Sequence, residues 1–141
     1  MKIIRDILKK DTNTEGAFKV TLACDLYKID LHLGLGDVSL DDMIAFANTI
    51  LEDFVSFETK AKTAIVNDFL QNYNEDWADE EKGYPELTEE AFKNNLEVTA
   101  IHFYAKDLID VFYTENGMFG NHYLVAHSHD GKHFKDTSMF G

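Results

Sequence analysis

The spacing of apolar residues changes twice along the chain, and this change constrains the fold more than any other feature of the sequence. Apolar and polar residues alternate in residues 16–34 and again from residue 96 onward, as they do in strands that bury one face. Between these segments, apolar residues recur at the spacing of amphipathic helices. The sequence therefore predicts two strands, then helices, then a second group of strands.

The first alternating segment, residues 16–34, predicts a hairpin. Its apolar residues form two sets of opposite parity: Phe18, Val20 and Leu22, then Tyr27, Ile29, Leu31 and Leu33. The parity changes at Asp25, which predicts a tight turn between two strands. His32 falls in the polar set and is predicted to be an exposed strand residue. Cys24 is the only cysteine; it is interpreted as a buried, inert thiol, and it leaves no intrachain disulfide or cysteine-rich zinc site.

Three helices are predicted, over about residues 40–55, 58–73 and 88–95. Ser39 and Thr88 stand where N-caps are expected, because their side-chain oxygens can accept from the free N–H groups of a first helical turn. Residues 74–86 contain few apolar side chains and the only proline, so they predict a surface loop.

The second alternating region predicts four strands: LEVTAIHFYA, DLIDVFYT, GNHYLVAHS and HFKDTSMF. Strands joined by short turns pair in antiparallel fashion, and neither a Gly-rich phosphate loop nor a long parallel crossover is recognised. The sequence therefore predicts a single α+β domain over residues 1–141. Its antiparallel sheet consists of the N-terminal hairpin and a C-terminal meander, and it packs against two to three helices.

The formal net charge of −13 at pH 7 limits the partners that the protein can bind. Nucleic acid and anionic membranes are bound through Lys and Arg that displace counterions, so neither is expected as a partner. An acidic surface instead accelerates association with a basic protein, although acidity also serves solubility alone. No apolar run has the length of a signal peptide or membrane span, so a cytoplasmic location is expected.

The segment HYLVAHSHDGKH, residues 122–133, contains four of the six histidines. His127 and His129 would project from one face of a strand and, with His133, form the candidate metal ligands. All of them lie at one hairpin end, whereas catalytic metal sites draw ligands from several elements. Exposed imidazoles with a structural His122 are therefore favoured over a metal site, and no cofactor is expected.

Signatures of catalysis are weak in this chain. Ser128 lies between two histidines but lacks the strand-turn-helix context of a nucleophile elbow. His102 and Tyr104 could exchange protons only within a pocket, and a hydrogen-bonded sheet histidine is the favoured interpretation of His102. The sequence therefore predicts no enzyme.

EDWADEE, residues 75–81, is predicted to contact a partner, and it is called the acidic segment below. The predicted contact residues are Glu75, Asp76, Trp77, Asp79, Glu80 and Glu81. Tryptophan is over-represented among residues that dominate binding energy, and surrounding charges set association rate and specificity. In the alternative interpretation, Trp77 packs beneath the loop as a core residue and leaves a solvated acidic turn.

Three groups of residues resemble the pattern of a bacterial family of small uncharacterised domains. They are Asn74 with Trp77, then Thr88 with Glu90 and Phe92, and finally Phe119, Gly120, Asn121 and His122. The resemblance covers nearly the whole chain. It departs from the family pattern at Gly-Asn-His, where a Gly-His pair is usual, and this departure concerns any role of His122.

Members of this and similar families resemble immunity proteins, which are encoded beside polymorphic or contact-dependent growth-inhibition toxins. The resemblance implies stoichiometric occlusion of a cognate toxin without chemistry. Many such toxins are nucleases with basic clefts, which an acidic inhibitor would reach quickly. Two alternatives remain open: a metal-binding protein or hydrolase that uses the His122–His133 cluster, and a housekeeping protein-interaction module.

Overall fold

The computed structural model of the protein describes residues 1–24 and 27–141. The predicted turn at Asp25 and the predicted burial of the Cys24 thiol lie outside this description. Within it, the chain forms these strands and helices in order: β1 (Lys9–Lys10), β2 (Phe18–Cys24), β3 (Tyr27–Leu33), α1 (Leu40–Glu52), α2 (Phe54–Asn72), α3 (Glu89–Asn94), β4 (Glu97–Ala105), β5 (Leu108–Thr114), β6 (Tyr123–Ser128) and β7 (Phe134–Phe140).

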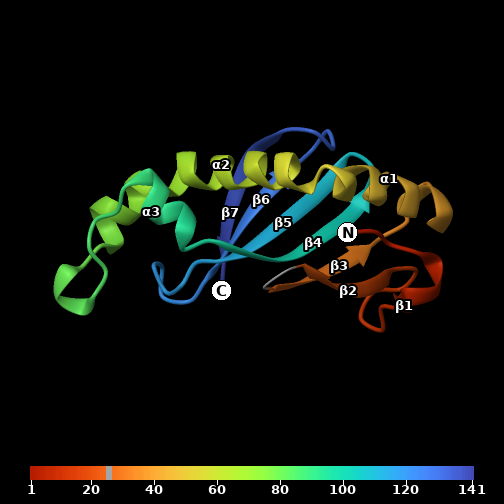
Figure 1. The fold of residues 1–141 in the computed structure, drawn as a ribbon, viewed down its shortest axis with the longest axis horizontal. Helices are drawn as coiled ribbons and strands as arrows, with labels where there is room; N and C mark the ends of the chain where they lie inside the picture. Colours follow the sequence, from red (N-terminus) through yellow and green to blue (C-terminus); the bar gives the residue numbers. More distant parts are fainter. Residues whose placement is uncertain (25–26) are drawn as a thin grey trace.

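The strands form one sheet in chain order, from β1 to β7, and the helices lie on one side of it (Figure 1). This is the predicted α+β architecture. Neighbouring strands are antiparallel with one exception: β3 and β4 run parallel, from the pair Asp30–Ala100 to the pair Leu33–Phe103. The connection between them carries all three helices. The expectation that the chain has no long parallel crossover is therefore wrong, because local apolar spacing records where strands are but not how distant strands pair.

The hydrophobic core lies between the helices and the facing side of the sheet. The alternation predicted from the sequence places these side chains there, each of them fully or almost fully buried: Ile29, Leu31, Leu33, Val98, Ile101, Phe103, Ile109, Val111, Tyr113, Leu124 and Ala126. Met43, Ala47, Ala61 and Ile65 of the helices are equally buried against them. No helix within residues 1–24 and 27–141 covers the opposite side, which is called the outer face below (Figure 1). The strand registers place His32, His102, Asp110, His127 and Ser138 on it.

Both predicted N-caps are confirmed. The Asp42 amide donates to Ser39 Oγ at 3.1 Å, and the Ala91 amide donates to Thr88 Oγ1 at 3.2 Å. The predicted boundary between the first two helices is wrong by a few residues, because only Asp53 separates them. Its φ of −116° and ψ of 49° are not helical, so the axis breaks there and the next residue already begins α2.

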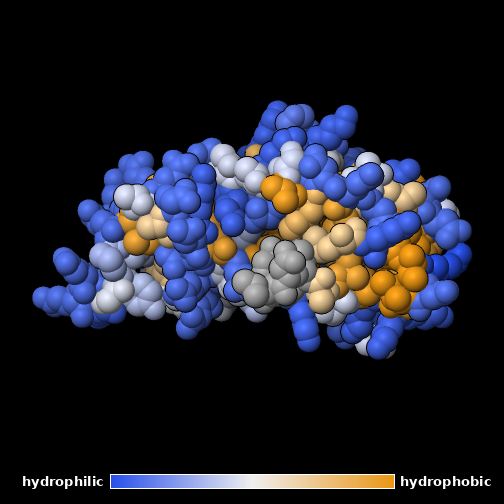
Figure 2. Space-filling model, in the orientation of Figure 1, coloured by the Kyte–Doolittle hydropathy of each residue, from blue (hydrophilic) through white to orange (hydrophobic). Residues whose placement is uncertain are grey.

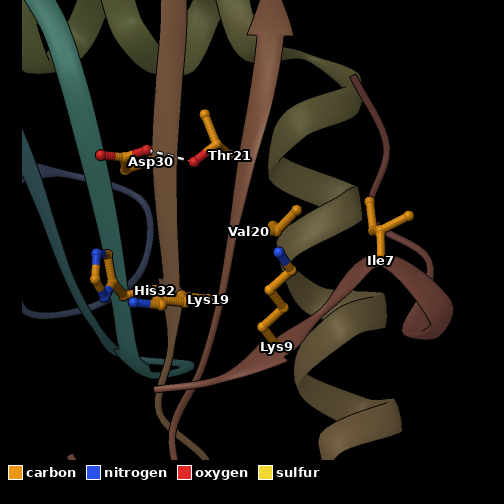
Figure 3. Close-up of a pocket in the computed structure, with 7 residues that line it drawn as sticks. All are labelled: Ile7, Lys9, Lys19, Val20, Thr21, Asp30 and His32. Carbon is orange, nitrogen blue, oxygen red and sulfur yellow. Dashed lines mark hydrogen bonds between the residues drawn. The ribbon is translucent and has the colours of Figure 1, made fainter. Parts of the chain in front are cut away.

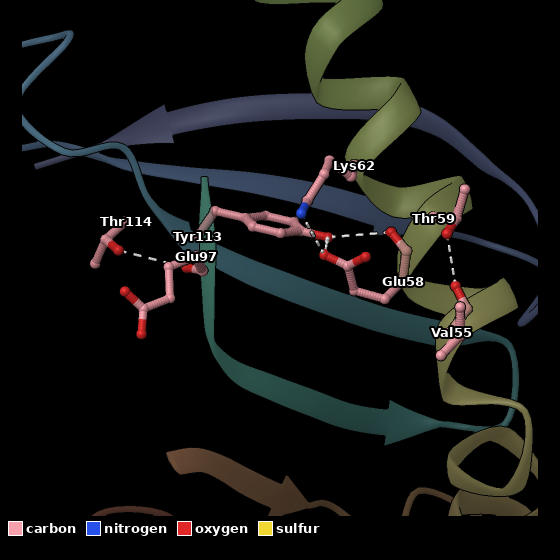
Figure 4. Close-up of polar contacts among 7 residues, drawn as sticks. All are labelled: Val55, Glu58, Thr59, Lys62, Glu97, Tyr113 and Thr114. Carbon is pink, nitrogen blue, oxygen red and sulfur yellow. Dashed lines mark hydrogen bonds and ion pairs between the residues drawn. The ribbon is translucent and has the colours of Figure 1, made fainter. Parts of the chain in front are cut away.

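A buried tyrosine joins α2 to the centre of the sheet (Figure 4). The hydroxyl of Tyr113 on β5 lies 3.3 Å from the Glu58 backbone oxygen and 3.2 Å from its carboxylate. Lys62, one turn further along α2, lies 3.3 Å from the same carboxylate. The polar end of a core side chain is thus satisfied by an ion pair at the helix–sheet boundary, which fixes where α2 crosses β5.

Residues 74–86 are more ordered than the predicted surface loop. Tyr73–Trp77 continues α2 as a π-helical turn, and Glu80–Lys82 forms a short 3-10 turn. The side chain of Asn74 makes two hydrogen bonds to the backbone of Leu87, donating to its oxygen at 3.0 Å and accepting from its amide at 2.8 Å. This pair closes the base of the segment and fixes the residues between.

Candidate functional site

Most of the negative charge lies in the helical connection between β3 and β4. Residues 34–96, which form this connection, contain fifteen of the 26 carboxylates but only four of the 13 Lys and Arg residues, a formal charge of −11. Residues 1–35 contain six of the basic residues. The acidic segment lies at the end of the molecule that carries α3, away from β1 (Figure 1), and that end is largely hydrophilic (Figure 2). Residues 75–90 at that end contain eight carboxylates and one lysine, a formal charge of −7.

Trp77 both packs against the core and remains partly exposed, so each of the two interpretations from the sequence describes part of its environment. Its ring lies edge-on to the buried Phe119 with centroids 5.4 Å apart, and 6.2 Å from the ring of His122. The residue nevertheless remains 40% exposed. One edge is thus held by the core while the rest of the indole is presented to solvent, which fixes its orientation before any partner arrives.

The carboxylates of the acidic segment are held by neighbouring residues. Gln71 donates to Glu75 and Asn72 donates to Asp76, each at 2.8 Å. Asp79 accepts from the Glu81 amide at 3.1 Å and so caps the 3-10 turn. Glu80 and Glu81 are exposed. The structure therefore places all six predicted contact residues on one short, ordered projection.

Further residues border the acidic segment that sequence analysis did not select. A hollow of about 420 Å³ beside Trp77 is also lined by Lys82, Tyr84 and Gly120. Tyr84 is 37% exposed, so a second aromatic ring is available there. Tyr84 lies between Gly83 and Pro85. Glycine and proline favour turns, so this position could have indicated an exposed aromatic residue.

The candidate metal ligands do not converge. His129 lies 3.6 Å from Asp136, and His133 lies 2.7 Å from Asp130, while His127 contacts other residues. No group of three His, Cys, Asp or Glu side chains in residues 1–24 and 27–141 is arranged to hold a metal ion. His122 donates from Nδ1 to the Phe119 carbonyl oxygen, in keeping with the structural role predicted for it.

The prediction that His127 is exposed is wrong. Its side chain is only 16% exposed because β6 lies between β5 and β7, and side chains from both strands enclose the ring. Nδ1 lies 2.6 Å from Asp110 Oδ1, and Nε2 lies 2.6 Å from Ser138 Oγ. An imidazole that donates from Nδ1 to the carboxylate has its Nε2 lone pair directed at the serine hydroxyl, and this hydrogen-bond network assigns the tautomer.

A second group of rings continues across the outer face. His32, predicted to be exposed, is half-buried with its ring centroid 4.2 Å from that of His102. His102 Nδ1 lies 3.0 Å from the Tyr104 hydroxyl, so the predicted hydrogen-bonded sheet histidine is confirmed. Burial, and secondarily the His32 imidazole, lower the pKa of His102 to about 4. The His102 imidazole is therefore uncharged at pH 7.

A hollow of about 580 Å³ opens where β1 ends beside β2 (Figure 3). Its polar lining includes Lys9, Lys19 and His32, together with Thr21, whose hydroxyl donates to Asp30 at 2.6 Å. Ile7 and Val20 supply its apolar wall. The hollow belongs to the less acidic end of the molecule.

Comparison with known proteins identifies a family. A family model described as an uncharacterized protein conserved in bacteria (DUF2262) matches residues 9–139. No curated protein and no solved structure matches the chain. Across the part of the chain that the structure describes, none of the helices has both the length and the apolar character needed to cross a membrane.

Proposed function

The chain belongs to the bacterial family DUF2262, and we propose that it is an immunity protein. In this proposal it neutralises a cognate toxin, one with a basic cleft as in nucleases, by binding it one to one. The observation that carries the proposal is the exposed Trp77 within an ordered acidic projection. Inhibition of this kind needs surface complementarity and no chemistry.

Electrostatics supports a basic partner. The helical connection carries a formal charge of −11, and such a field attracts a basic surface over about a Debye length, near 8 Å at physiological salt. Attraction of this kind raises the association rate far more than it raises affinity. A basic cleft evolved for phosphate would meet the carboxylates of the acidic segment in place of a nucleic-acid backbone.

Packing supports Trp77 as the dominant contact. Interface hot spots are enriched in tryptophan and tyrosine, and preorganised side chains lose less entropy on binding. Trp77 is fixed against Phe119 before binding, and Tyr84 lines the same hollow. Trp77→Ala is therefore expected to weaken binding by about 2 kcal/mol or more, roughly 30-fold in Kd.

The test is co-purification with the product of the gene immediately upstream, followed by calorimetry and association kinetics. The proposal expects a one-to-one complex with nanomolar or tighter Kd, whose association rate falls as salt is raised. The double variant Glu80→Lys with Glu81→Lys should slow association markedly.

The matched control is Asp6→Lys with Glu15→Lys, which changes net charge equally at two exposed positions far along the chain from the acidic segment. A smaller effect of the control places the interface at the acidic segment. Equal effects would assign the binding to overall charge and remove the acidic segment from the proposal. A toxin-gene product that does not bind would refute the immunity function.

A further inference from the structure

We propose that Ser138 is an activated nucleophile on the outer face, with His127 as its general base and Asp110 as the residue that positions the base, and that it reacts with neutral carboxylic esters. This activity is independent of toxin binding. It rests on three side chains from three adjacent strands, none of which is near the others in the sequence.

Strand register brings the three groups together. Asp110 on β5 stands opposite His127 on β6, and Ser138 on β7 stands opposite Val125, two residues before His127. Both contacts of the imidazole are 2.6 Å long, one from each ring nitrogen. A chain of hydrogen bonds from serine to histidine to aspartate is the arrangement of a catalytic triad. Such triads are identified by their geometry and not by sequence position.

Burial favours proton transfer over exchange with water. The side chains of His127 and Asp110 are 16% and 13% exposed, so few water molecules compete for the two hydrogen bonds. The carboxylate holds the Nδ1 proton, and Nε2 remains free to accept the serine proton. Once formed, the imidazolium would be stabilised by Asp110 and by Asp136, which stands opposite His127 on β7.

Another imidazole borders the site. The ring of His129 lies roughly parallel to that of His127 with centroids 6.4 Å apart, and it pairs with Asp136 at 3.6 Å. The side chains of His129 and Asp136 are 62% and 63% exposed, so water largely screens the attraction between them. His127 is therefore the residue placed to act as the base.

Neighbouring side chains indicate the class of ester. Tyr123 and Phe140 stand opposite each other on the same face as Ser138, and they are 49% and 51% exposed. Together they offer an apolar platform beside the hydroxyl for an aliphatic or aromatic acyl group. Because the net charge of −13 repels anions, a neutral ester is favoured over a phosphate or carboxylate substrate.

The reaction balances without a further reagent. Ser138 Oγ attacks the ester carbonyl carbon while its proton passes to His127 Nε2; the bond to the alcohol oxygen then breaks, and the alcohol leaves with that proton. Water, deprotonated by His127, next attacks the acyl-serine. The carboxylic acid leaves and the serine hydroxyl is restored.

The test uses p-nitrophenyl butyrate and a fluorophosphonate probe on the full chain. The expected result is one adduct per chain, mapped to Ser138 by peptide mass spectrometry, and release of p-nitrophenol that Ser138→Ala abolishes. His127→Ala should slow the reaction at least about 100-fold, the usual contribution of a general base. Ser56→Ala, which removes an exposed serine on α2, should leave the rate unchanged.

A purely structural role for the three residues predicts a different outcome. In that case their variants would lower thermal stability, while Ser138 would react no faster than Ser56, and the proposal would be overturned. Chemical rescue separates the roles further: added imidazole should restore the reaction of a folded His127→Gly variant, and failure to do so would also count against His127 as base. If that variant does not fold, Asp110→Asn should slow labelling and shift its pH profile in a folded protein, and an unchanged rate and profile would refute the positioning role.

Toxin binding provides an independent readout. Ser138→Ala removes no group of the acidic segment, so it should keep any complex with the toxin intact. Loss of esterase chemistry therefore leaves the immunity proposal standing, and loss of toxin binding leaves the Ser138 proposal standing.

Discussion

At the scale of single residues, the outer face shows how neighbours set the charge of a histidine. His102 is half-buried beside His32, with ring centroids 4.2 Å apart. Two positive charges at this separation would repel each other, which disfavours protonation of His102. Burial is the larger cause of its low pKa and His32 the second, outweighing the opposite effect of Asp110. His102 is therefore a neutral packing residue at physiological pH.

Acid should destabilise the protein through this histidine. The pKa of His102 falls from 6.5 to about 4 on folding, so between these values the unfolded chain binds more protons. Stability is thus expected to decrease as pH falls from about 6.5 to about 4 and to lose nothing further from this group below that. Chemical denaturation across this range should show a weaker pH dependence for His102→Gln. An NMR titration of His102 near pH 6.5 would contradict the expectation.

Residue-scale predictions from sequence succeeded where the interaction is local. Ser39 and Thr88 each accept a hydrogen bond from an amide only three residues further along the chain, so local spacing alone identified them as N-caps. The contacts of His127 could not be predicted in this way. Asp110 and Ser138 reach it from two other strands, and nothing in the sequence around either residue indicates that pairing.

At the scale of elements, Asn74 decides the shape of the acidic segment. Its side-chain amide hydrogen-bonds both the backbone N–H and the backbone carbonyl of Leu87, where the chain turns from the acidic segment toward α3. Without it, a half-buried amide and carbonyl would lose their hydrogen bonds, at a cost of about 1–3 kcal/mol.

Asn74→Ala is accordingly expected to lower the free energy of unfolding by roughly that amount, measured by urea denaturation. It should also raise hydrogen exchange in residues 75–87. Asn67→Ala, at an exposed position of α2, is the matched control and should change stability by less than about 0.5 kcal/mol. Equal effects of the two variants would show that Asn74 does not fix the segment.

Among the residues that the structure describes, apolar spacing predicted every strand of four or more residues together with α1 and α2, whereas α3 was predicted from its Thr88 cap. It missed the short strand β1, whose two residues are both exposed lysines. It also missed the helical turn at Tyr73–Trp77. That turn is stabilised by side-chain contacts such as Asn72 with Asp76, and its single fully buried residue is too little to produce a periodic signal.

At the scale of the whole molecule, charge and topology coincide. The long connection between β3 and β4 contributes the helical layer and nearly all of the net negative charge, whereas the strands are close to neutral. Composition predicted that the protein is acidic. It could not predict that residues 75–90, with a formal charge of −7, would lie together at one end, because that depends on the crossover placing α3 and the acidic segment beyond the sheet.

Because β3 pairs with β4 across a long connection, the N-terminal hairpin and the C-terminal meander are expected to fold at different stages. Strands β4 to β7 are linked by short connections and can assemble from nearby contacts, whereas β3 meets β4 only after residues 34–96 have been looped out. The N-terminal hairpin is therefore expected to dock last and to open first as a subglobal unit. Native-state hydrogen exchange should show lower protection for Ile29 and Leu31 than for Val111 and Leu124. Since His32 faces His102 across this junction, this difference in protection is expected to widen as pH falls from about 6.5 to about 4.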